Sequence, residues 1–319
     1  MKTLLLRLLW FSYFCYDYLS CIPSFKRIRD IDSKLSIKLS NYLRANKTKT
    51  NIVIFACYEK DLKDDYINYF ISKLKDCQLI IINNSNENKP SISEVGKRVV
   101  WINRPNFSRD IGAYRLGISA CKRSKLKPSD TITLTNDSFF VLKDSFFDFL
   151  VSPLQSEVIG HSFSSSPEPH IRSYCLRFNP KILDKLAIYL ARIKPLRSRY
   201  SAIIQGEIGM SKNVLLKRDF RIRLLHSPVE SIKKQRINNT SGDFILDPYE
   251  ISQTTTTYMP EIIKREVVEK GLAKSKLVAS MVSQSSLPNN VKNSILHRML
   301  IDKTKKNLAY RFKRFIGEI

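Results

Sequence analysis

The feature that most constrains this chain is an alternation, over residues 51–163, of short apolar runs with segments whose apolar residues recur at helical spacing. The apolar runs have the length and β-branched content of buried strands and cover residues 51–58, 77–83, 98–104, 130–136 and 156–163. The segments between them, 62–75, 110–122 and 145–154, are predicted helices. This alternation predicts an α/β fold with three layers and a mostly parallel central sheet. Ligands of such sheets bind beyond the carboxyl ends of the strands.

The rest of the chain is expected to be largely helical. Residues 179–193 and 205–219 have helical patterns, and a short basic strand is predicted at 220–225. Residues 227–260 are polar and indicate an extended loop, after which a helix is predicted from Glu261, with a break near Pro288 and a basic amphipathic helix at the end. The chain therefore divides into a helical N-terminal extension at 1–50, a core at 51–228 and a C-terminal extension at 229–319.

The net charge narrows the range of partners. Lys and Arg total 54 and Asp and Glu 29, so the net charge of +25 favours nucleic acid, an anionic membrane surface or phosphorylated small molecules. Residues 22–50 carry eight basic and two acidic residues, a net +6, and residues 230–319 carry sixteen and nine, a net +7. Because both flanks also carry apolar residues at helical spacing, they are either solvated basic helices or helices that lie on an anionic membrane.

The first twenty residues are apolar but are interrupted by Arg7 and Asp17, and the uncharged run from Leu8 to Tyr16 is too short to span a bilayer. An interfacial or packed helix is favoured over a cleaved signal, since no small-residue cleavage site follows. Six cysteines are scattered without a C-x-x-C pair, which is typical of reduced thiols in a cytosolic protein. We therefore expect a cytoplasmic protein, peripheral at the cytoplasmic face of the membrane.

One candidate site lies where the strand at 98–104 gives way to the helix at 110–122. A helix N-terminus presents free backbone N–H groups and a positive potential, which suit a phosphate or nucleotide. Arg104, Arg109 and Arg115 would add cationic donors there, and Ser108 or Asp110 is available as the helix cap. Gly112 would allow close packing against another segment. The alternative is an ordinary capped helix whose charged residues form surface pairs.

A second candidate site directly follows the strand at 130–136. The triplet Asn136-Asp137-Ser138 places a carboxylate between two polar side chains at the end of a buried strand. Such oxygen ligands suit Mg²⁺ or Mn²⁺, which share their coordination with substrate phosphates. The alternative is an Asx turn that closes the strand.

The order of these motifs resembles nucleotide-sugar glycosyltransferases of the A-type fold, and more closely the rhamnan synthesis F family, whose members build rhamnose-containing surface polysaccharides. The family pattern is approximately Asn-x-Gly-x-Asp-Ile-Gly-Ala-Tyr, then Asn-Asp-Ser, then His-Leu-Gln-Ser-Tyr-Phe. Here the matching stretches lie at 106–114, 136–138 and 170–175. The resemblance covers approximately residues 51–220. Ser108 stands where the family often has Gly, and residues 171–172 and 175 also differ.

The resemblance implies roles for individual residues. Asp137 would meet the diphosphate and a divalent cation, Mg²⁺ or Mn²⁺, although the triplet has one carboxylate where many A-type enzymes have two, which leaves metal dependence open. The donor would be bound by Asn106, Arg109, Asp110, Tyr114, Asn136 and Ser138. The sugar or acceptor would be lined by His170, Ser173 and Tyr174.

The catalytic base is the remaining role. Inverting transfer requires a carboxylate that deprotonates the acceptor hydroxyl. Glu207, flanked by Gly206 and Gly209, is the first candidate, because A-type enzymes often carry the base at this place, and Glu168 is the reserve. The alternative for Glu207 is an acid that meets a helix dipole. Asp137 would be the second catalytic residue, since its surroundings would stabilise the leaving diphosphate.

These observations lead to an expected function. The chain would be a glycosyltransferase that moves a rhamnose-like deoxyhexose or another hexose from a nucleotide diphosphate donor to a lipid-linked glycan or cell-surface polysaccharide. The alternative is a non-catalytic, degenerate transferase that serves as a membrane-associated scaffold in polysaccharide assembly. A nucleic-acid partner is not expected, because the sequence has no zinc finger, RNP-type or helix-turn-helix pattern, and no P-loop string occurs.

Overall fold

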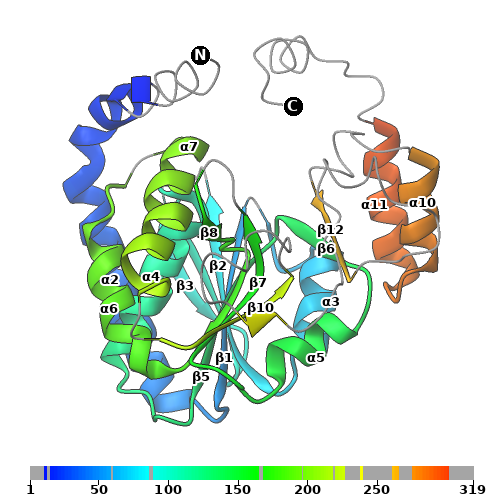
Figure 1. Cartoon of the computed structure of the whole chain (residues 1–319), viewed down its shortest axis with the longest axis horizontal. Coiled ribbons are helices and arrows are strands. Elements are labelled where there is room, and N and C mark those ends of the chain that lie inside the picture. Colours follow the sequence, from blue (N-terminus) through cyan, green and yellow to red (C-terminus); the bar gives the residue numbers. More distant parts are fainter. Residues whose placement is uncertain are drawn as a thin grey trace.

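The computed structural model describes residues 11–12, 15–58, 60–85, 89–164, 168–195, 197–217, 220–226, 238–239, 261–265 and 275–301. It is an α/β structure in which helices cover both faces of a mixed, mostly parallel sheet (Figure 1). The predicted fold class is therefore confirmed at this level. The expected loop at 227–260, apart from the strand Asn238–Asn239, and the expected final helix beyond residue 301 lie outside the described residues.

The central sheet has ten strands. The spatial order is β11 (Asn238–Asn239), β10 (Ile222–His226), β7 (Val158–Ser164), β9 (Cys175–Phe178), β5 (Thr131–Asn136), β1 (Asn51–Tyr58), β2 (Cys77–Ser85), β4 (Val99–Pro105) and β3 (Ser91–Glu94). Strand β8 (His170–Ile171) pairs with β7. Neighbouring strands in this order pair in parallel, except that β9 runs antiparallel to both β7 and β5, and β3 runs antiparallel to β4.

The sheet separates two hydrophobic cores. On one face Ile52 and Ile54 of β1 pack with helices α2 (Phe25–Asn46), α4 (Arg109–Arg123) and α6 (Leu183–Arg192). On the other face Val53 and Phe55 pack with α3 (Asp65–Lys73), α5 (Ser145–Val151), α10 (Ser275–Gln284) and α11 (Asn289–Ile301). Successive residues of a strand point to opposite faces, so a continuous apolar run serves both cores.

The predicted strands and helices of residues 51–163 are all present, with ends shifted by a few residues. The helix expected at 179–193 is a short 3₁₀ turn, Pro180–Ile182, followed by α6. The helix expected at 205–219 begins earlier, with α7 (Arg199–Ser201), and continues as two π-helical segments, η3 (Ala202–Ile208) and η4 (Ser211–Leu215). Pro288 separates α10 from α11, as predicted.

Two expectations about the flanks differ from the structure. The expected N-terminal extension includes α2, whose Leu35, Leu39 and Leu43 are buried in the first core, so this helix is part of the core rather than an appendage. The helix predicted from Glu261 is instead a strand, β12 (Ile262–Lys264), which pairs antiparallel with β6 (Phe139–Val141). Its two isoleucines are fully buried in the second core, and this burial outweighs the local helical pattern.

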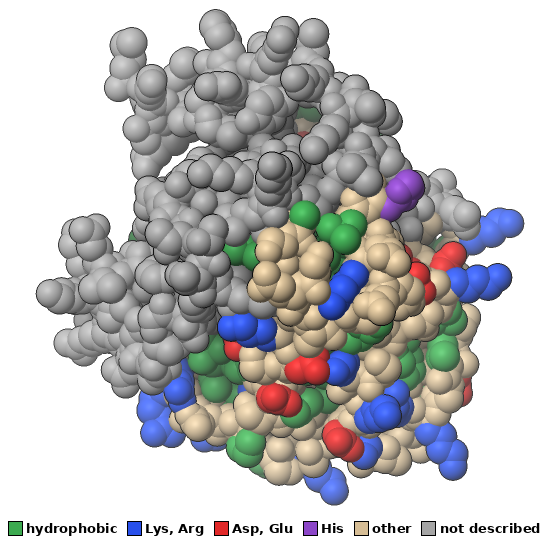
Figure 2. Space-filling model, turned by 90° about the vertical axis from the view of Figure 1, so that its right-hand side faces the viewer, with side chains coloured by type: hydrophobic (Ala, Val, Ile, Leu, Met, Phe, Trp, Pro, Cys, Tyr) green, Lys and Arg blue, Asp and Glu red, His purple; other side chains and the backbone are tan. Residues whose placement is uncertain are grey.

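The apolar character of the helices and the distribution of surface charge both bear on membrane and polyanionic partners. In the described part of the chain, no helix has the length and apolar character needed to cross a bilayer. Figure 2 shows the side that is at the right in Figure 1; the described side chains there carry charges of both signs, interspersed with apolar groups. The excess positive charge therefore does not form a single patch on the described part of that face.

Candidate active site

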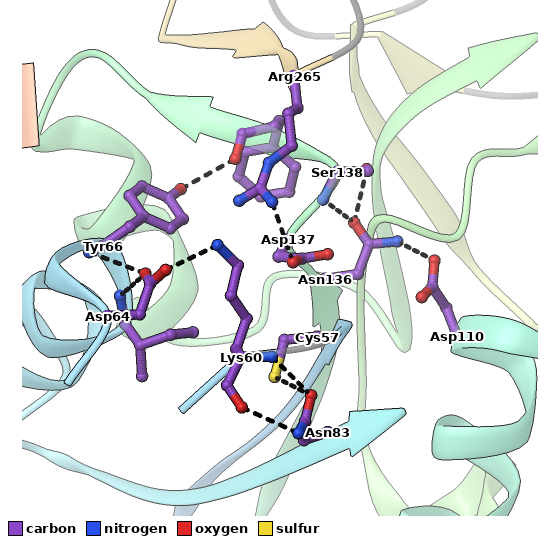
Figure 3. Close-up of polar contacts among 12 residues, drawn as sticks. Cys57, Lys60, Asp64, Tyr66, Asn83, Asp110, Asn136, Asp137, Ser138 and Arg265 are labelled. Carbon is purple, nitrogen blue, oxygen red and sulfur yellow. Dashed lines mark hydrogen bonds and ion pairs between the residues drawn. The ribbon is translucent and has the colours of Figure 1, made fainter. Parts of the chain in front are cut away.

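The candidate site lies at the carboxyl ends of the parallel strands, as the sequence predicted. Strands β1, β2, β4 and β5 run in parallel, so their carboxyl ends share one edge of the sheet. Asn136 ends β5, and Asp110 lies in the first turn of α4. Asn136 Nδ2 donates a hydrogen bond of 2.7 Å to Asp110 Oδ2 (Figure 3). The two motifs found separately in the sequence are thus bonded directly to each other.

The triplet after β5 forms a tight polar turn. Asn136 Oδ1 accepts hydrogen bonds from Ser138 N at 3.1 Å and from Ser138 Oγ at 2.6 Å, which is an Asx turn. The Asp137 N–H donates to the carbonyl of Ala56 at 3.0 Å and so fixes the turn to β1. The interpretation of the triplet as a turn is confirmed, and the same turn presents the Asp137 carboxylate at the sheet edge.

Asp137 is a nearly buried carboxylate with cations beside it. Its Oδ2 lies 3.3 Å from Arg265 Nη1, and only 12% of the side chain is exposed. Burial raises the pKa of Asp137, while the positive charges of Arg265 and Lys60 lower it. The guanidinium also lies 5.0 Å from the centre of the Phe140 ring, so it is held between a carboxylate and an aromatic face.

Asp110 belongs to the same electrostatic cluster. Burial raises its pKa to about 7, and the negative charges of Asp137 and Glu207 add to this effect, while Arg109 and the hydrogen bond from Asn136 oppose it. Carboxylates that perturb each other in this way share one site. Near neutral pH, Asp110 is therefore able to take up or release a proton, a property typical of functional sites.

Glu207 is surrounded by the residues expected on the sugar or acceptor side. Its Oε1 accepts hydrogen bonds from Ser173 N at 3.0 Å and Ser173 Oγ at 2.8 Å, and its Oε2 lies 3.7 Å from His170 Nε2. His170 is oriented from its other nitrogen, which lies 2.7 Å from the carbonyl oxygen of Glu168. The side chain of Glu168, the reserve base, is about half exposed and lies 4.0 Å from Lys212 Nζ.

A glycine allows Glu207 to reach this position. A Cβ on Gly206 would lie 2.2 Å from Ile111 Cγ1, so η3 approaches α4 more closely than any other residue would permit. Ile111 is the neighbour of Asp110, and Gly206 is the neighbour of Glu207. The contact therefore brings the two acids together. π-Helical segments such as η3 are frequent at functional sites.

Two predicted contact residues lie beneath the site instead. Tyr114 is fully buried and its hydroxyl donates to the carbonyl of Ser173 at 3.1 Å. Tyr174 is 2% exposed, shares a 2.6 Å hydrogen bond with Ser162 Oγ, and has Lys264 Nζ 4.1 Å from its ring centre. Both hydroxyls are buried and hydrogen-bonded to other protein groups, so this placement does not support the expected contact of Tyr114 and Tyr174 with donor or acceptor. They position Ser173 and its neighbours.

Two arginines assigned to the same junction are also structural. Arg104 is fully buried, and its Nε and Nη2 donate to the Asp32 carboxylate at 3.1 and 3.3 Å. Arg115 is 8% exposed and its Nη2 donates to the same carboxylate. The expectation that they supply cations to a ligand is therefore wrong. The counter-ion lies on α2, whose packing the sequence does not reveal. Gly112 has the predicted packing role, since a Cβ there would meet the Phe107 carbonyl oxygen at 2.2 Å.

The start of α4 is strained. Ser108 and Arg109 have φ angles of 59° and 48°, a left-handed conformation that favours glycine. Ser108 occupies the N-cap position, but its Oγ donates to the carbonyl of Lys194, so it does not cap the helix. Arg109 is exposed beside Asp110. Asn106 Oδ1 is a buried acceptor with no hydrogen-bond partner among the described residues.

Two cations that the sequence did not indicate complete the site. Lys60 follows β1, and its Nζ lies 2.7 Å from Asp64 Oδ2 (Figure 3). Asn83 fixes the Lys60 backbone by accepting from its N–H at 3.1 Å and donating to its carbonyl at 3.0 Å. Arg265 follows β12. Lys60 could have been found by inspecting the residues after β1, whereas Arg265 depends on a strand pairing over more than a hundred residues of sequence.

An open hollow of about 380 Å³ adjoins Lys60. Trp101 forms part of its wall and donates from Nε1 to Asn103 Oδ1 at 3.0 Å. Asn103 in turn accepts from Asn83 at 3.0 Å, which links the hollow to the Lys60 loop. The hollow is lined by Lys60, Asp61, Leu62, Lys63, Trp101 and Asn103.

The described residues do not fit a divalent cation. Asp137 is the carboxylate of the triplet, and its Oδ2 already faces a guanidinium. Asn136 Oδ1, another potential ligand oxygen of the triplet, accepts two hydrogen bonds from Ser138. Within the described part of the chain, no group of three or more His, Cys, Asp or Glu side chains is arranged to hold a metal ion. We therefore derive no step that passes through a metal.

Comparison with known proteins assigns no function. No protein-family model matches the chain. The uncharacterized protein y4gN of Sinorhizobium fredii is 25% identical over 139 residues, which are 41% of this chain and 36% of that protein. The chain thus matches about a third of its relative, and the relative's name states no activity. The function has to be argued from the site.

Proposed function

We propose that this protein is a glycosyltransferase that uses a nucleotide-sugar donor. It transfers a rhamnose-like deoxyhexose, or another hexose, to a lipid-linked glycan or a growing cell-surface polysaccharide. The observation that carries the proposal is the convergence of Asp110, Asp137 and Glu207 at the carboxyl edge of the parallel strands. This is where α/β sheets bind their ligands. The adjacent cations and open hollow supply what a diphosphate and a nucleoside require.

The residues near the triplet and those around Glu207 have different roles in the proposed reaction. The donor diphosphate lies near the triplet, where Ser138 and the cations stabilise the charge that develops on the leaving group. Glu207 acts as the base that removes the proton from the acceptor hydroxyl as the acceptor oxygen attacks the anomeric carbon and the bond to the diphosphate breaks. Ser173 and His170 orient Glu207 through the contacts described above. Asp110 shapes the donor side through Asn136.

Donor binding tests this proposal. Purified protein is titrated calorimetrically with a panel of nucleotide sugars that differ in base and sugar. We expect at least one donor to bind, and Asp137→Ala and Asp110→Ala to abolish binding while the circular dichroism spectrum is retained. Asp148→Ala is a matched control, because Asp148 lies on α5 and not at the sheet edge. If no nucleotide sugar or nucleoside diphosphate binds, the proposal is refuted.

A non-catalytic scaffold is the second candidate function. The observation that favours it is that Asp137, the one carboxylate of the triplet, is paired with Arg265. Such a protein would bind a nucleotide sugar and a glycan assembly complex without transferring sugar. Donor binding with no release of nucleoside diphosphate, on any lipid-linked acceptor, would favour this alternative.

The N-terminal segment supports association with an anionic membrane. Phe11, Tyr16 and Leu19 are exposed to 65%, 74% and 67%, and basic side chains follow on α2. Asp17, beside Tyr16, accepts hydrogen bonds from Arg197 N, Ser198 N and Ser201 Oγ, which join this part of the segment to the chain that leads into η3. A surface of this kind would hold the site close to a lipid-linked acceptor at the cytoplasmic face.

A further inference from the structure

A basic segment from the C-terminal part of the chain is built into the candidate site. Strand β12 pairs with β6 in a register that sets Ile263 opposite Phe140 and Lys264 opposite Phe139. The Arg265 N–H then donates to the carbonyl of Ser138 at 2.9 Å. Because the strand is anchored by two fully buried isoleucines, the backbone of Arg265 is held directly beside the triplet.

The Arg265 side chain is directed at the one carboxylate of the triplet. Its Nη1 lies 3.3 Å from Asp137 Oδ2, 15% of the side chain is exposed, and the guanidinium is supported by the Phe140 ring. A guanidinium has five N–H donors in a planar fork, so it can keep one edge on a carboxylate while another edge binds phosphate oxygens. An ammonium group cannot divide its donors in this planar way.

Two fixed cations lie beside the triplet. Arg265 is paired with the Asp137 carboxylate at 3.3 Å, and Lys60 is paired with Asp64 at 2.7 Å. Both cations lower the pKa of Asp137, whereas the charge of Asp64 raises it. Asp110, with its pKa raised to about 7, carries only part of a negative charge at neutral pH. A diphosphate has the charge and the number of acceptors to contact both cations.

We propose that Arg265, together with Lys60, takes the place of a divalent cation at this site, so that the protein binds the diphosphate of its donor without metal. This inference rests on the proposed function, since it concerns the same ligand. It assigns the β12 segment, which the sequence suggested was an appendage, to the binding machinery. It also explains why one carboxylate suffices in the triplet: Asp137 orients Arg265 rather than ligating a metal.

The test compares nucleoside diphosphate binding with and without metal. The full chain is titrated by calorimetry with UDP, GDP, ADP and dTDP, in EDTA and in excess Mg²⁺ or Mn²⁺. We expect at least one diphosphate to bind in EDTA, with a dissociation constant within about threefold of the value in metal. Arg265→Gln should weaken binding about 10- to 100-fold, as loss of a charged hydrogen bond would. Arg265→Lys, which keeps the charge, should fall between Arg265→Gln and the wild type.

Controls separate binding from folding. Arg44→Gln removes an arginine that bonds to the Arg123 carbonyl near the opposite edge of the sheet and should bind as the wild type does. Circular dichroism checks each variant, and the comparison of EDTA with metal needs no variant. Binding that requires metal, or Arg265→Gln that binds normally, would overturn this inference and leave the proposed function standing. Absence of binding under every condition would overturn both.

Discussion

Replacement of Asp32 by asparagine tests the packing of α2 and the structural role of two arginines. Asp32 on α2 is the shared counter-ion of Arg104 and Arg115. The exposed fractions of the three side chains are 8%, 0% and 9%. Asparagine keeps the shape of the side chain but removes its charge. Both guanidiniums would then remain buried without their counter-ion.

The magnitude follows from this burial. Removal of one partner from a buried ion pair typically costs about 3–5 kcal/mol. Arg104 would keep its bonds to Asn84 Oδ1 and the Phe107 carbonyl, and Arg115 its bond to the Ile193 carbonyl, so we expect the lower part of that range, about 3 kcal/mol. With a denaturant slope of about 3 kcal/mol per molar urea, the unfolding midpoint would fall by about 1 M.

The assay is urea unfolding followed by circular dichroism. Asp30→Asn is the matched control, because Asp30 is an exposed acid on the same helix and should change the free energy of unfolding by about 0.5 kcal/mol or less. Adding Arg115→Met to Asp32→Asn should restore part of the stability by removing one uncompensated charge. If Asp32→Asn unfolds at the same urea concentration as Asp30→Asn, the argument for a buried triad is wrong.

Three further predictions concern the site itself. Compared with the wild type, Asp110→Asn should be more stable at pH 8 than at pH 5. The pKa of Asp110 is about 7 in the folded protein against 3.8 for an ordinary aspartate, so the wild type loses stability as pH rises between those values and the variant does not. Urea unfolding of both proteins at both pH values measures this. Gly206→Ala should cost about 1–3 kcal/mol, since its Cβ would meet Ile111 Cγ1 at 2.2 Å. Ile111→Ala removes that atom, so the double variant should lose less stability than the sum of the two single variants, whereas additive effects would contradict the contact. Arg109→Gly should be about 1 kcal/mol more stable than Arg109→Ala, because only glycine relieves a φ of 48°; equal thermal midpoints would refute the strain.

Much of the core could be predicted from the sequence because its signals are local. Each parallel strand is a continuous apolar run, and each of α3 and α4 has apolar residues at helical spacing. The rule that ligands meet the carboxyl ends of strands then placed Asp110 and Asn136 at one edge, where they are bonded. Glu207 lies close to Asp110 because of the contact between Gly206 and Ile111, which cannot be predicted from local sequence.

The errors come from partners distant in sequence. The local sequence around Arg104 predicts a cation near a helix N-terminus that is available to a ligand. Its counter-ion, however, is Asp32, which lies 72 residues earlier on α2. Arg265 has no local motif and reaches Asp137 over 128 residues through the β12–β6 pairing. The motif that contains Tyr114 predicts a contact with the donor, but α4 packs against the sheet and two helices, so the Tyr114 hydroxyl reaches the Ser173 carbonyl instead.

The most direct test of the central claim is release of nucleoside diphosphate from a bound nucleotide sugar in the presence of a lipid-linked acceptor. We predict release by the wild type, and release at least about 100-fold slower by Glu207→Gln, with donor affinity unchanged, as expected when a general base is lost. Donor binding without release, or equal release by Glu207→Gln, would contradict the account.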